Sequence, residues 1–184
     1  PMNAVLGFAQ LLDSDPETQL TDKQKTFVDE ILRSGHHMIE LINDVLDLGQ
    51  IETGNLPLEI GDYELGPMIH GCVGMVEALA DQAEISLEHC QVPDNLPLVR
   101  VDSRRFRQAL LNLLSNAVKY NRPRGEVSMA IELTRAGNVR IEVSDSGAGI
   151  PAGAYDKVFE PFERLEAASS DVQGTGIGLK YFII

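Results

Sequence analysis

The stretch 101–121 constrains the fold of this chain most, because a regular helical pattern there carries polar residues that helices rarely favour. Asp102 or Ser103 can cap a helix, and Asn121-Arg122-Pro123 can end it. The apolar residues recur at helical spacing; they are Phe106, Leu110, Leu113, Leu114 and Ala117. We therefore predict a helix with one buried face.

A second face of this predicted helix carries Asn112, Asn116 and Lys119 at positions i, i+4 and i+7. Asn is a mediocre helix former, so two asparagines on one face need a reason. An Asn amide oxygen can complete the oxygen shell of a metal ion, and a Lys ammonium can meet a phosphate. A solvated polar edge is the alternative interpretation, and the helix alone does not decide between the two.

Composition limits the class of protein. The chain has 184 residues, of which 43% are hydrophobic, as in a globular domain with a smaller element attached. The net charge of -13 argues against nucleic acid as the main partner. Cys72 and Cys90 form no CxxC pattern, so we expect no disulfide framework and no zinc site. Without a signal peptide or a long apolar run, we expect a cytoplasmic location, although the full-length protein could be membrane-anchored by other segments.

The first fifty residues predict two helices. Residues 2–12 have helical apolar spacing, residues 13–20 read as a turn, and Thr21 with Gln24 forms a capping box that starts a second helix. Along the second helix an apolar seam alternates in steps of four and three, at Phe27, Ile31, Ser34, Met38, Leu41, Val45 and Leu48. Two helices alone bury little surface, so we predict a dimeric four-helix bundle. A hairpin that packs on its own downstream domain is the alternative.

The rest of the chain mixes strands and helices. We expect a linker at 53–55, a strand over 56–60, a helix over 65–83, strands over 86–92 and 98–101, and a hairpin of strands 126–133 and 139–144. This order predicts an α+β sandwich with helices on one face of an antiparallel sheet. The predicted domains are residues 1–53 and 54–184.

Three further motifs bear on chemistry. Asp145 stands at a strand end before Gly147 and Gly149, where it can accept a hydrogen bond from an exocyclic amine or make a simple Asx turn. The Phe-Glu-Pro-Phe sequence at 159–162 fits either a small satellite core or a direct role. Residues 174–179 read Gly-Thr-Gly-Ile-Gly-Leu, a run that can present backbone N–H groups to phosphate and that is neither a Walker A nor a dinucleotide motif.

The order NLLSNAVKY, DSGAGI, FEPF and GTGIGL resembles the N, G1, F and G2 boxes of sensor histidine kinases. The resemblance implies the Bergerat ATP-binding fold that gyrase-type ATPases share, with ATP and Mg²⁺ as ligands. The amino-terminal hairpin resembles the family's dimerisation and histidine-phosphotransfer domain. Pro1-Met2-Asn3 resembles the end of its H-box, so the phospho-accepting histidine would lie just before Pro1.

The resemblance also implies roles for individual residues. Asn116 resembles the Mg²⁺ ligand, Asn112 faces the phosphates one turn earlier, and Lys119 resembles the phosphate-contacting lysine. The other cofactor-binding residues implied are Tyr120 beside the nucleotide, Asp145 on the adenine amine, Gly147 and Gly149 at the pocket floor, and Gly174, Thr175, Gly176, Gly178 and Leu179 beyond the lid. Residues 151–173 resemble that ATP lid.

Two features depart from the family pattern. His36 and His37 lie on the second helix and not in an H-box, so we interpret them, with His70 and His89, as structural or surface residues. After the last glycine box the family continues into a helix, whereas Lys180 to Ile184 have a β-rich character.

The resemblance predicts an ATP-dependent protein-histidine kinase, with Asn112 and Lys119 at the catalytic site. The expected partners are a second copy of the hairpin, a response-regulator receiver domain and an upstream sensor domain. Related ATP hydrolases carry a Glu where Asn112 stands, and an Asn cannot act as a base, so Asn112 favours the kinase over a gyrase-type ATPase. A dimeric nucleotide-binding scaffold without kinase activity is the other alternative.

Overall fold

The computed structural model describes residues 1–15, 20–53, 56–88, 92–93 and 96–160. The chain divides into two compact units, Pro1–Leu56 and Pro57–Ile184. Among the described residues, no helix combines the length and the hydropathy that a bilayer span requires.

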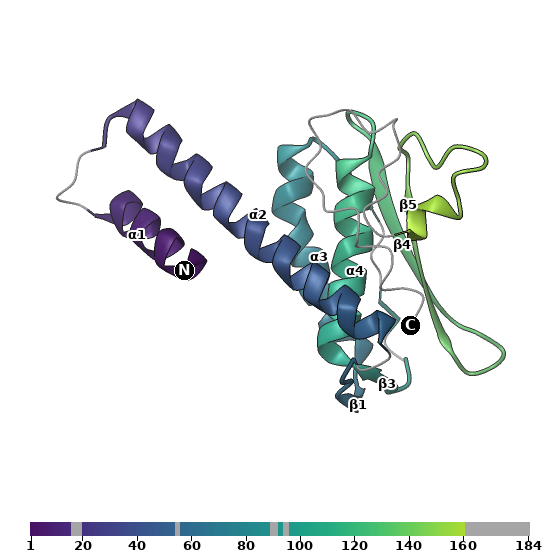
Figure 1. Ribbon diagram of the computed structural model, residues 1–184. Coiled ribbons are helices and arrows are strands. Elements are labelled where there is room, and N and C mark those ends of the chain that lie inside the picture. The colour runs from purple at the N-terminus through teal and green to yellow at the C-terminus, as the bar shows by residue number, and fades with distance from the viewer. Residues whose placement is uncertain (16–19, 54–55, 89–91, 94–95, 161–184) are drawn as a thin grey trace. The chain divides into compact units, whose positions relative to one another are not determined.

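The first unit is a pair of helices, α1 (Met2–Ser14) and α2 (Asp22–Glu52). Figure 1 shows α1 beside the first part of α2 and running in the opposite direction. Thr21 starts α2 as predicted: its N–H donates to Gln24 Oε1 at 2.9 Å, and Gln24 N–H donates to Thr21 Oγ1 at 3.4 Å. This reciprocal pair satisfies two N–H groups that a helix start otherwise leaves without partners.

The contact between α1 and α2 uses a different stripe from the predicted seam. Leu6 and Ala9 on α1 and Val28 on α2 are buried. A Cβ on Gly35 would lie 2.5 Å from Leu6 Cδ2, so the missing side chain lets α1 pack close to α2. The seam residues Phe27, Ile31, Met38 and Val45 are instead about half exposed, from 46% to 55%, and the side chain of Leu48 lies outside the described part. The hairpin therefore leaves an apolar face of α2 uncovered.

The second unit alternates strands and helices. In chain order these are β1 (Ile60–Tyr63), α3 (Leu65–Gln82), β2 (Ser86–Glu88), β3 (Val99–Asp102), α4 (Ser103–Lys119), β4 (Glu126–Leu133), β5 (Val139–Asp145) and the short 3-10 helix η1 (Lys157–Phe159). β1 pairs antiparallel with β3, and a second sheet has the order β2-β4-β5. β4 and β5 form the predicted antiparallel hairpin.

The core of this unit lies between the helices and the sheets. Figure 1 shows α3 and α4 side by side next to the β4–β5 ribbon, and α4 packs on both strands. The buried cluster takes Ile69, Cys72 and Val76 from α3, Leu110 and Leu114 from α4, and Val127 and Met129 from β4. Burial raises the pKa of the Cys72 thiol, which therefore stays protonated. The α+β prediction is confirmed.

Two details of the strand prediction were wrong. The first strand begins at Ile60 and not at Leu56, because Pro57 has no N–H to donate and the N–H of Glu59 donates to a side chain, Asp102 Oδ2, at 2.9 Å. The predicted sheet was antiparallel, but β2 pairs with β4 in parallel. A parallel pair needs a long crossover, and the chain supplies one through β3 and α4.

Asp102 is the N-cap of α4 and is only 6% exposed. Its Oδ1 accepts from the N–H groups of Arg104 and Arg105 at 2.9 and 3.1 Å. These hydrogen bonds, that from Arg105 first and then that from Glu59, lower the pKa of the carboxyl group. One ionised side chain therefore holds both the start of α4 and the segment just before β1.

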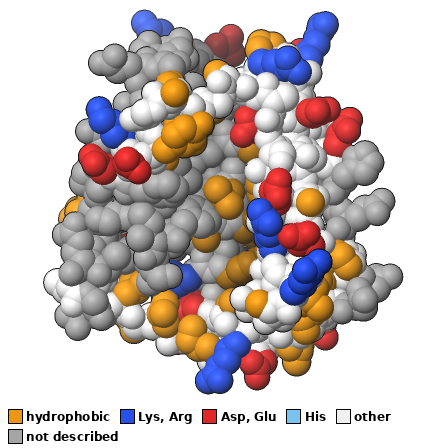
Figure 2. Space-filling view, turned by 90° about the vertical axis from the view of Figure 1, so that its right-hand side faces the viewer, with side chains coloured by type: hydrophobic (Ala, Val, Ile, Leu, Met, Phe, Trp, Pro, Cys, Tyr) orange, Lys and Arg blue, Asp and Glu red, His pale blue; other side chains and the backbone are white. Residues whose placement is uncertain are grey.

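The outer surface of the β4–β5 ribbon is mixed in character. Arg140 lies 3.4 Å from a carboxylate oxygen of Glu132 and 3.9 Å from one of Glu142. Figure 2 shows acidic, basic and hydrophobic side chains close together on this side of the molecule. Exposed ion pairs of this kind add little stability, so we attribute the fold to the core and to the caps.

Candidate functional site

The C-terminal half of α4 carries the predicted polar face. Asn112 and Asn116 are half-buried, and Lys119 is exposed in the last turn. The core-facing stripe of the same helix, which includes Leu114, is buried. Since the core fixes the rotation of α4 about its axis, the asparagines are held on the flank of the helix while Lys119 reaches solvent.

The end of α4 is well defined by main-chain hydrogen bonds. The Tyr120 N–H donates to the Asn116 carbonyl oxygen at 2.9 Å, and the Asn121 N–H donates to the Val118 carbonyl at 3.3 Å. The Tyr120 side chain is exposed. A cation in the last turn of a helix, here Lys119, also meets the negative end of the helix dipole.

The turn after β5 carries the predicted Asp and glycines. Asp145 is exposed, and its Oδ1 accepts from the Gly147 N–H at 2.8 Å, which is an Asx turn. Gly149 has a φ of 68°, in the left-handed region that residues other than glycine rarely adopt. The turn thus presents a carboxylate at the end of a strand that the β4–β5 ladder holds in place.

The end of α4 and the turn after β5 lie in contact. A Cβ on Gly147 would meet the Tyr120 carbonyl oxygen and would lie 3.2 Å from Asn121 Cα. Only glycine permits this approach of two main chains. The structure therefore brings together Tyr120, Asp145 and Gly147, three of the residues that the sequence singled out.

Two residues of this contact were missed as site residues. Asn121 was assigned only to the helix end and Ser146 only to the turn, yet the Ser146 hydroxyl donates to Asn121 Oδ1 at 3.0 Å. Each immediately follows a predicted site residue, Tyr120 and Asp145. A polar side chain at both neighbouring positions is the signal that could have identified them.

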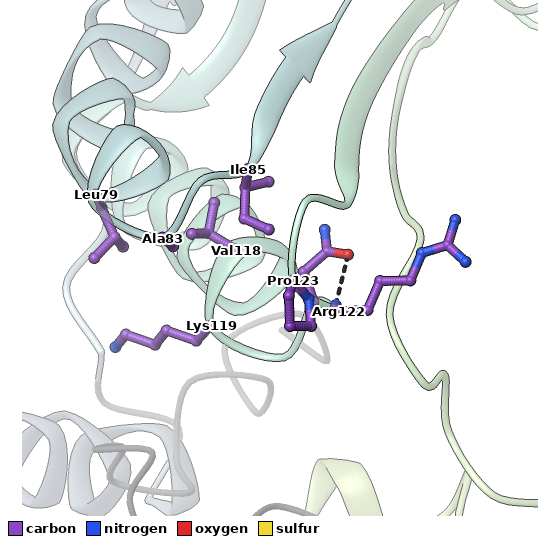
Figure 3. Close-up of a pocket in the computed structure, with 8 residues that line it drawn as sticks. Leu79, Ala83, Ile85, Val118, Lys119, Arg122 and Pro123 are labelled. Carbon is purple, nitrogen blue, oxygen red and sulfur yellow. Dashed lines mark hydrogen bonds between the residues drawn. The ribbon is translucent and has the colours of Figure 1, made fainter.

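A hollow of about 350 Å³ lies beside the end of α4 (Figure 3). It is lined by Leu79, Ala83, Ile85, Val118, Lys119, Asn121, Arg122 and Pro123. Figure 3 shows Lys119 along one side of the apolar group and Arg122 pointing away from it. The hollow thus shares Lys119 with the predicted polar site, whereas Asn112, Asn116 and Asp145 do not line it.

Several predicted residues lie outside the described part of the chain. These are Gly174, Thr175, Gly176, Gly178 and Leu179, together with residues 161–173 of the predicted lid and Pro161 and Phe162 of the Phe-Glu-Pro-Phe sequence. Of the histidines, His36 and His70 are exposed and His37 is half-buried. No group of three or more His, Cys, Asp or Glu residues suited to a metal ion occurs among the residues that the structure describes.

Two family models match the chain. Residues 1–54 match the "His Kinase A (phospho-acceptor) domain", and residues 101–182 match the "Histidine kinase-, DNA gyrase B-, and HSP90-like ATPase" family. The second match supports nucleotide binding by the second unit. It also includes the residues that lie outside the described part.

Among curated proteins, the chain is 36% identical to the circadian input-output histidine kinase CikA of Synechococcus elongatus over 97% of its own length. It is 34% identical to the non-motile and phage-resistance protein of Caulobacter vibrioides, again over 97% of this chain. The chain spans only 24% and 22% of these two relatives.

Solved structures share the fold of this chain. Full-length ShkA, determined in complex with AMPPNP, is 31% identical with a TM-score of 0.77, over 99% of this chain and 37% of that one. The Acinetobacter baumannii histidine kinase AdeS, at 22% identity and a TM-score of 0.65, shares the fold over 98% of this chain and 80% of its own. The predicted combination of a helical hairpin with a Bergerat-type ATP-binding domain is confirmed.

Proposed function

The chain belongs to the sensor histidine kinase family, and on this premise we propose that it transfers the γ-phosphate of ATP to a histidine. The acceptor lies in the H-box just upstream of Pro1 in the longer protein, and the phosphate then passes to an aspartate of a response regulator. A homodimer through the hairpin and an upstream sensor domain complete the assembly.

One observation carries this proposal: in a chain of this family, the helix end with Lys119 and Tyr120 is bonded to the turn with Asp145 and Gly147. A ligand that spans both needs an amine at one end and phosphates at the other, as ATP has. The contact at Gly147 leaves no room for a side chain, so the spacing of the two halves is fixed by the main chain.

Each half has a distinct task in nucleotide binding. The Asp145 carboxylate accepts a hydrogen bond from the adenine amino group, and Tyr120 flanks the nucleotide. Lys119 contributes a point charge to the phosphates. The glycine run at 174–178, with Thr175 and Leu179, completes the phosphate side. These residues position ATP and neutralise charge, which is the main part of catalysis in phosphoryl transfer.

The donor set suits Mg²⁺ held jointly with substrate. Mg²⁺ commonly takes one or two protein oxygens plus phosphate oxygens and waters. The half-buried Asn116 amide would supply such an oxygen, and the described residues hold no carboxylate cluster that would bind the ion alone. When bound, Mg²⁺ would draw charge from the phosphates. Asn112, one turn earlier, offers no base to activate water, so the arrangement favours transfer to an imidazole over hydrolysis.

Replacing Asp145 tests the adenine contact. We expect Asp145→Asn to abolish ATP binding in calorimetry while the fold stays intact by circular dichroism, because the Asn amide can present a donor to the adenine amine. Asp62→Asn, an exposed aspartate on β1, is the matched control. Unchanged ATP affinity in folded Asp145→Asn would refute the assignment.

Replacing Asn116 tests the metal contact. We expect Asn116→Ala to weaken ATP binding with Mg²⁺ by about tenfold and binding in excess chelator by much less, since one metal ligand is lost. An equal loss under both conditions would show that Asn116 has a structural role only.

The full-length protein tests the reaction itself. Incubation with γ-labelled ATP should give an acid-labile phosphate, and replacement of the H-box histidine should abolish it. Label that persists in that variant, on His36 or His37, would contradict the assigned acceptor.

A further inference from the structure

We propose that Asn121 and Ser146 are positioning residues, which set the spacing between the adenine half and the phosphate half of the nucleotide site. This inference rests on the proposed function. It concerns the pair of side chains that joins the end of α4 to the turn after β5.

Asn121 is the centre of a small hydrogen-bond network. Its Oδ1 accepts from the Ser146 hydroxyl at 3.0 Å and from the Arg122 N–H at 2.9 Å, the bond drawn in Figure 3. Its Nδ2 donates to the Glu126 carbonyl oxygen at 3.0 Å. The side chain thus ties α4 to the first residue of β4 and to the turn at once.

Ser146 completes the network from the opposite side. Its hydroxyl oxygen accepts from the Glu126 N–H at 2.9 Å, and its own N–H donates to the Glu126 carbonyl at 3.1 Å. The single hydroxyl proton is used on Asn121, so the side chain has no donor left for a ligand. This supports a positioning role and not a contact with substrate.

Glycine allows the network to close. A Cβ on Gly125 would lie 2.6 Å from Ser146 Oγ and would also meet Asn121 Oδ1. Two glycines therefore lie next to the pair. Gly125 lies close to Ser146 Oγ and Asn121 Oδ1, and Gly147 lies close to the Tyr120 carbonyl oxygen. Such close packing makes the geometry of the pair sensitive to the loss of either side chain.

A ligand that spans both halves should report on the spacing. ATP contacts Asp145 at one end and Lys119 and Asn116 at the other, whereas adenosine contacts only the adenine half. If the pair fixes the spacing, loss of either side chain weakens the binding of ATP, because the second contact is no longer made at the right distance. Adenosine is much less affected, since a single half needs no spacing.

The test compares the two ligands in Asn121→Ala and Ser146→Ala. We expect the Kd for Mg-ATP to rise about fivefold to tenfold and that for adenosine to change less than about twofold, as befits the loss of one or two hydrogen bonds. Ser146→Thr keeps the hydroxyl and should restore ATP affinity. Ser144→Ala, an exposed serine two positions earlier on β5, is the matched control and should leave the affinity for both ligands unchanged.

Each result decides the matter. An equal loss of ATP and adenosine affinity would overturn the positioning role, and so would a Ser146→Thr variant that binds ATP as weakly as Ser146→Ala. In either case, ATP binding by the wild-type protein would still support the proposed function. A wild-type protein that binds neither ligand would overturn both. A lower melting temperature with an unchanged ratio of the two affinities would show that the pair has a structural role only.

Discussion

The two units of this chain differ in how far they bury their apolar side chains. In the second unit the described residues form one cluster of twelve buried side chains, which come from α3, α4 and β4 and include Ile85 in the turn before β2. In the first unit only Leu6, Ala9 and Val28 are buried hydrophobic residues among those described, while α2 leaves Phe27, Ile31 and Met38 about half exposed.

This difference shows that the apolar periodicity of a helix does not by itself reveal which part of the protein covers its apolar face. The stripe of α4 is covered by its own unit, so the second unit contains what it needs to fold. The seam of α2 is not covered by α1, and a hairpin of this size buries too little surface to be stable alone. We therefore expect the stability of the first unit to depend on protein concentration and that of the second unit not to.

The largest effect we predict is on association. Met38→Lys together with Leu41→Lys would place two charges in the core of the proposed four-helix bundle, at a cost of several kcal/mol. We expect wild type to sediment as a dimer and the double variant as a monomer, with a dissociation constant raised at least about 100-fold. Sedimentation equilibrium measures both.

A matched control separates the seam from hydrophobicity in general. Met75 is 68% exposed on α3, so Met75→Lys makes the same chemical change outside the seam and should leave the dimer intact. Nucleotide binding should survive in both the double variant and the control. A wild-type monomer would contradict the bundle and favour a hairpin whose seam is covered in another way.

The second prediction concerns Asp102, which stabilises the second unit only. We expect Asp102→Asn to lower the free energy of unfolding at neutral pH by about 1–2 kcal/mol, because a charged acceptor of three N–H bonds becomes neutral. Hydrogen exchange of α4 measures this, and exchange in α1 and α2 should not change. Asp81→Asn, on the exposed end of α3, is the control.

The pH dependence of this effect has a definite sign. The folded-state pKa of Asp102 is lowered, so its ionised form stabilises the fold above the unfolded value of about 3.9. That contribution is lost as the pH falls through the lowered pKa. The gap between wild type and Asp102→Asn should therefore be full at neutral pH and should shrink in acid below about pH 4. A gap that stays constant in acid would exclude a role for the charge.

Much of the second unit could be predicted from the sequence, because its signals are local. Helix α4 follows from its apolar spacing, with Asp102 or Ser103 as the predicted cap, of which the structure has Asp102. The β4–β5 hairpin follows from alternation around a turn. The parallel pairing of β2 with β4 could not be predicted, since it depends on a crossover between distant segments.

The candidate site divides in the same way. Asn116, Lys119 and Asp145 were identified because a motif or a helix face makes them unusual. The polar neighbours of Tyr120 and Asp145 could have drawn attention to Asn121 and Ser146, but the bond between them joins residues 25 positions apart, so no local pattern predicts that bond. The Gly35 contact with Leu6 was missed for the same reason, because a glycine in a helix gives no sign of what packs against it.

The smallest effect we predict is at the start of α2, where Thr21 and Gln24 cap each other. Thr21→Ala removes one side of this box and should destabilise the first turn by about 1 kcal/mol, the usual cost of losing an N-cap. Hydrogen exchange of residues 22–26 should rise accordingly. Thr26→Ala is the control: the Thr26 hydroxyl only donates to the Asp22 carbonyl within the helix, so its removal should have almost no effect. Because the capping bonds are local, the Thr21→Ala effect should be the same in the dimer and in the Met38→Lys/Leu41→Lys monomer. A larger effect in the monomer would mean that association, and not the cap, holds the start of α2 in wild type.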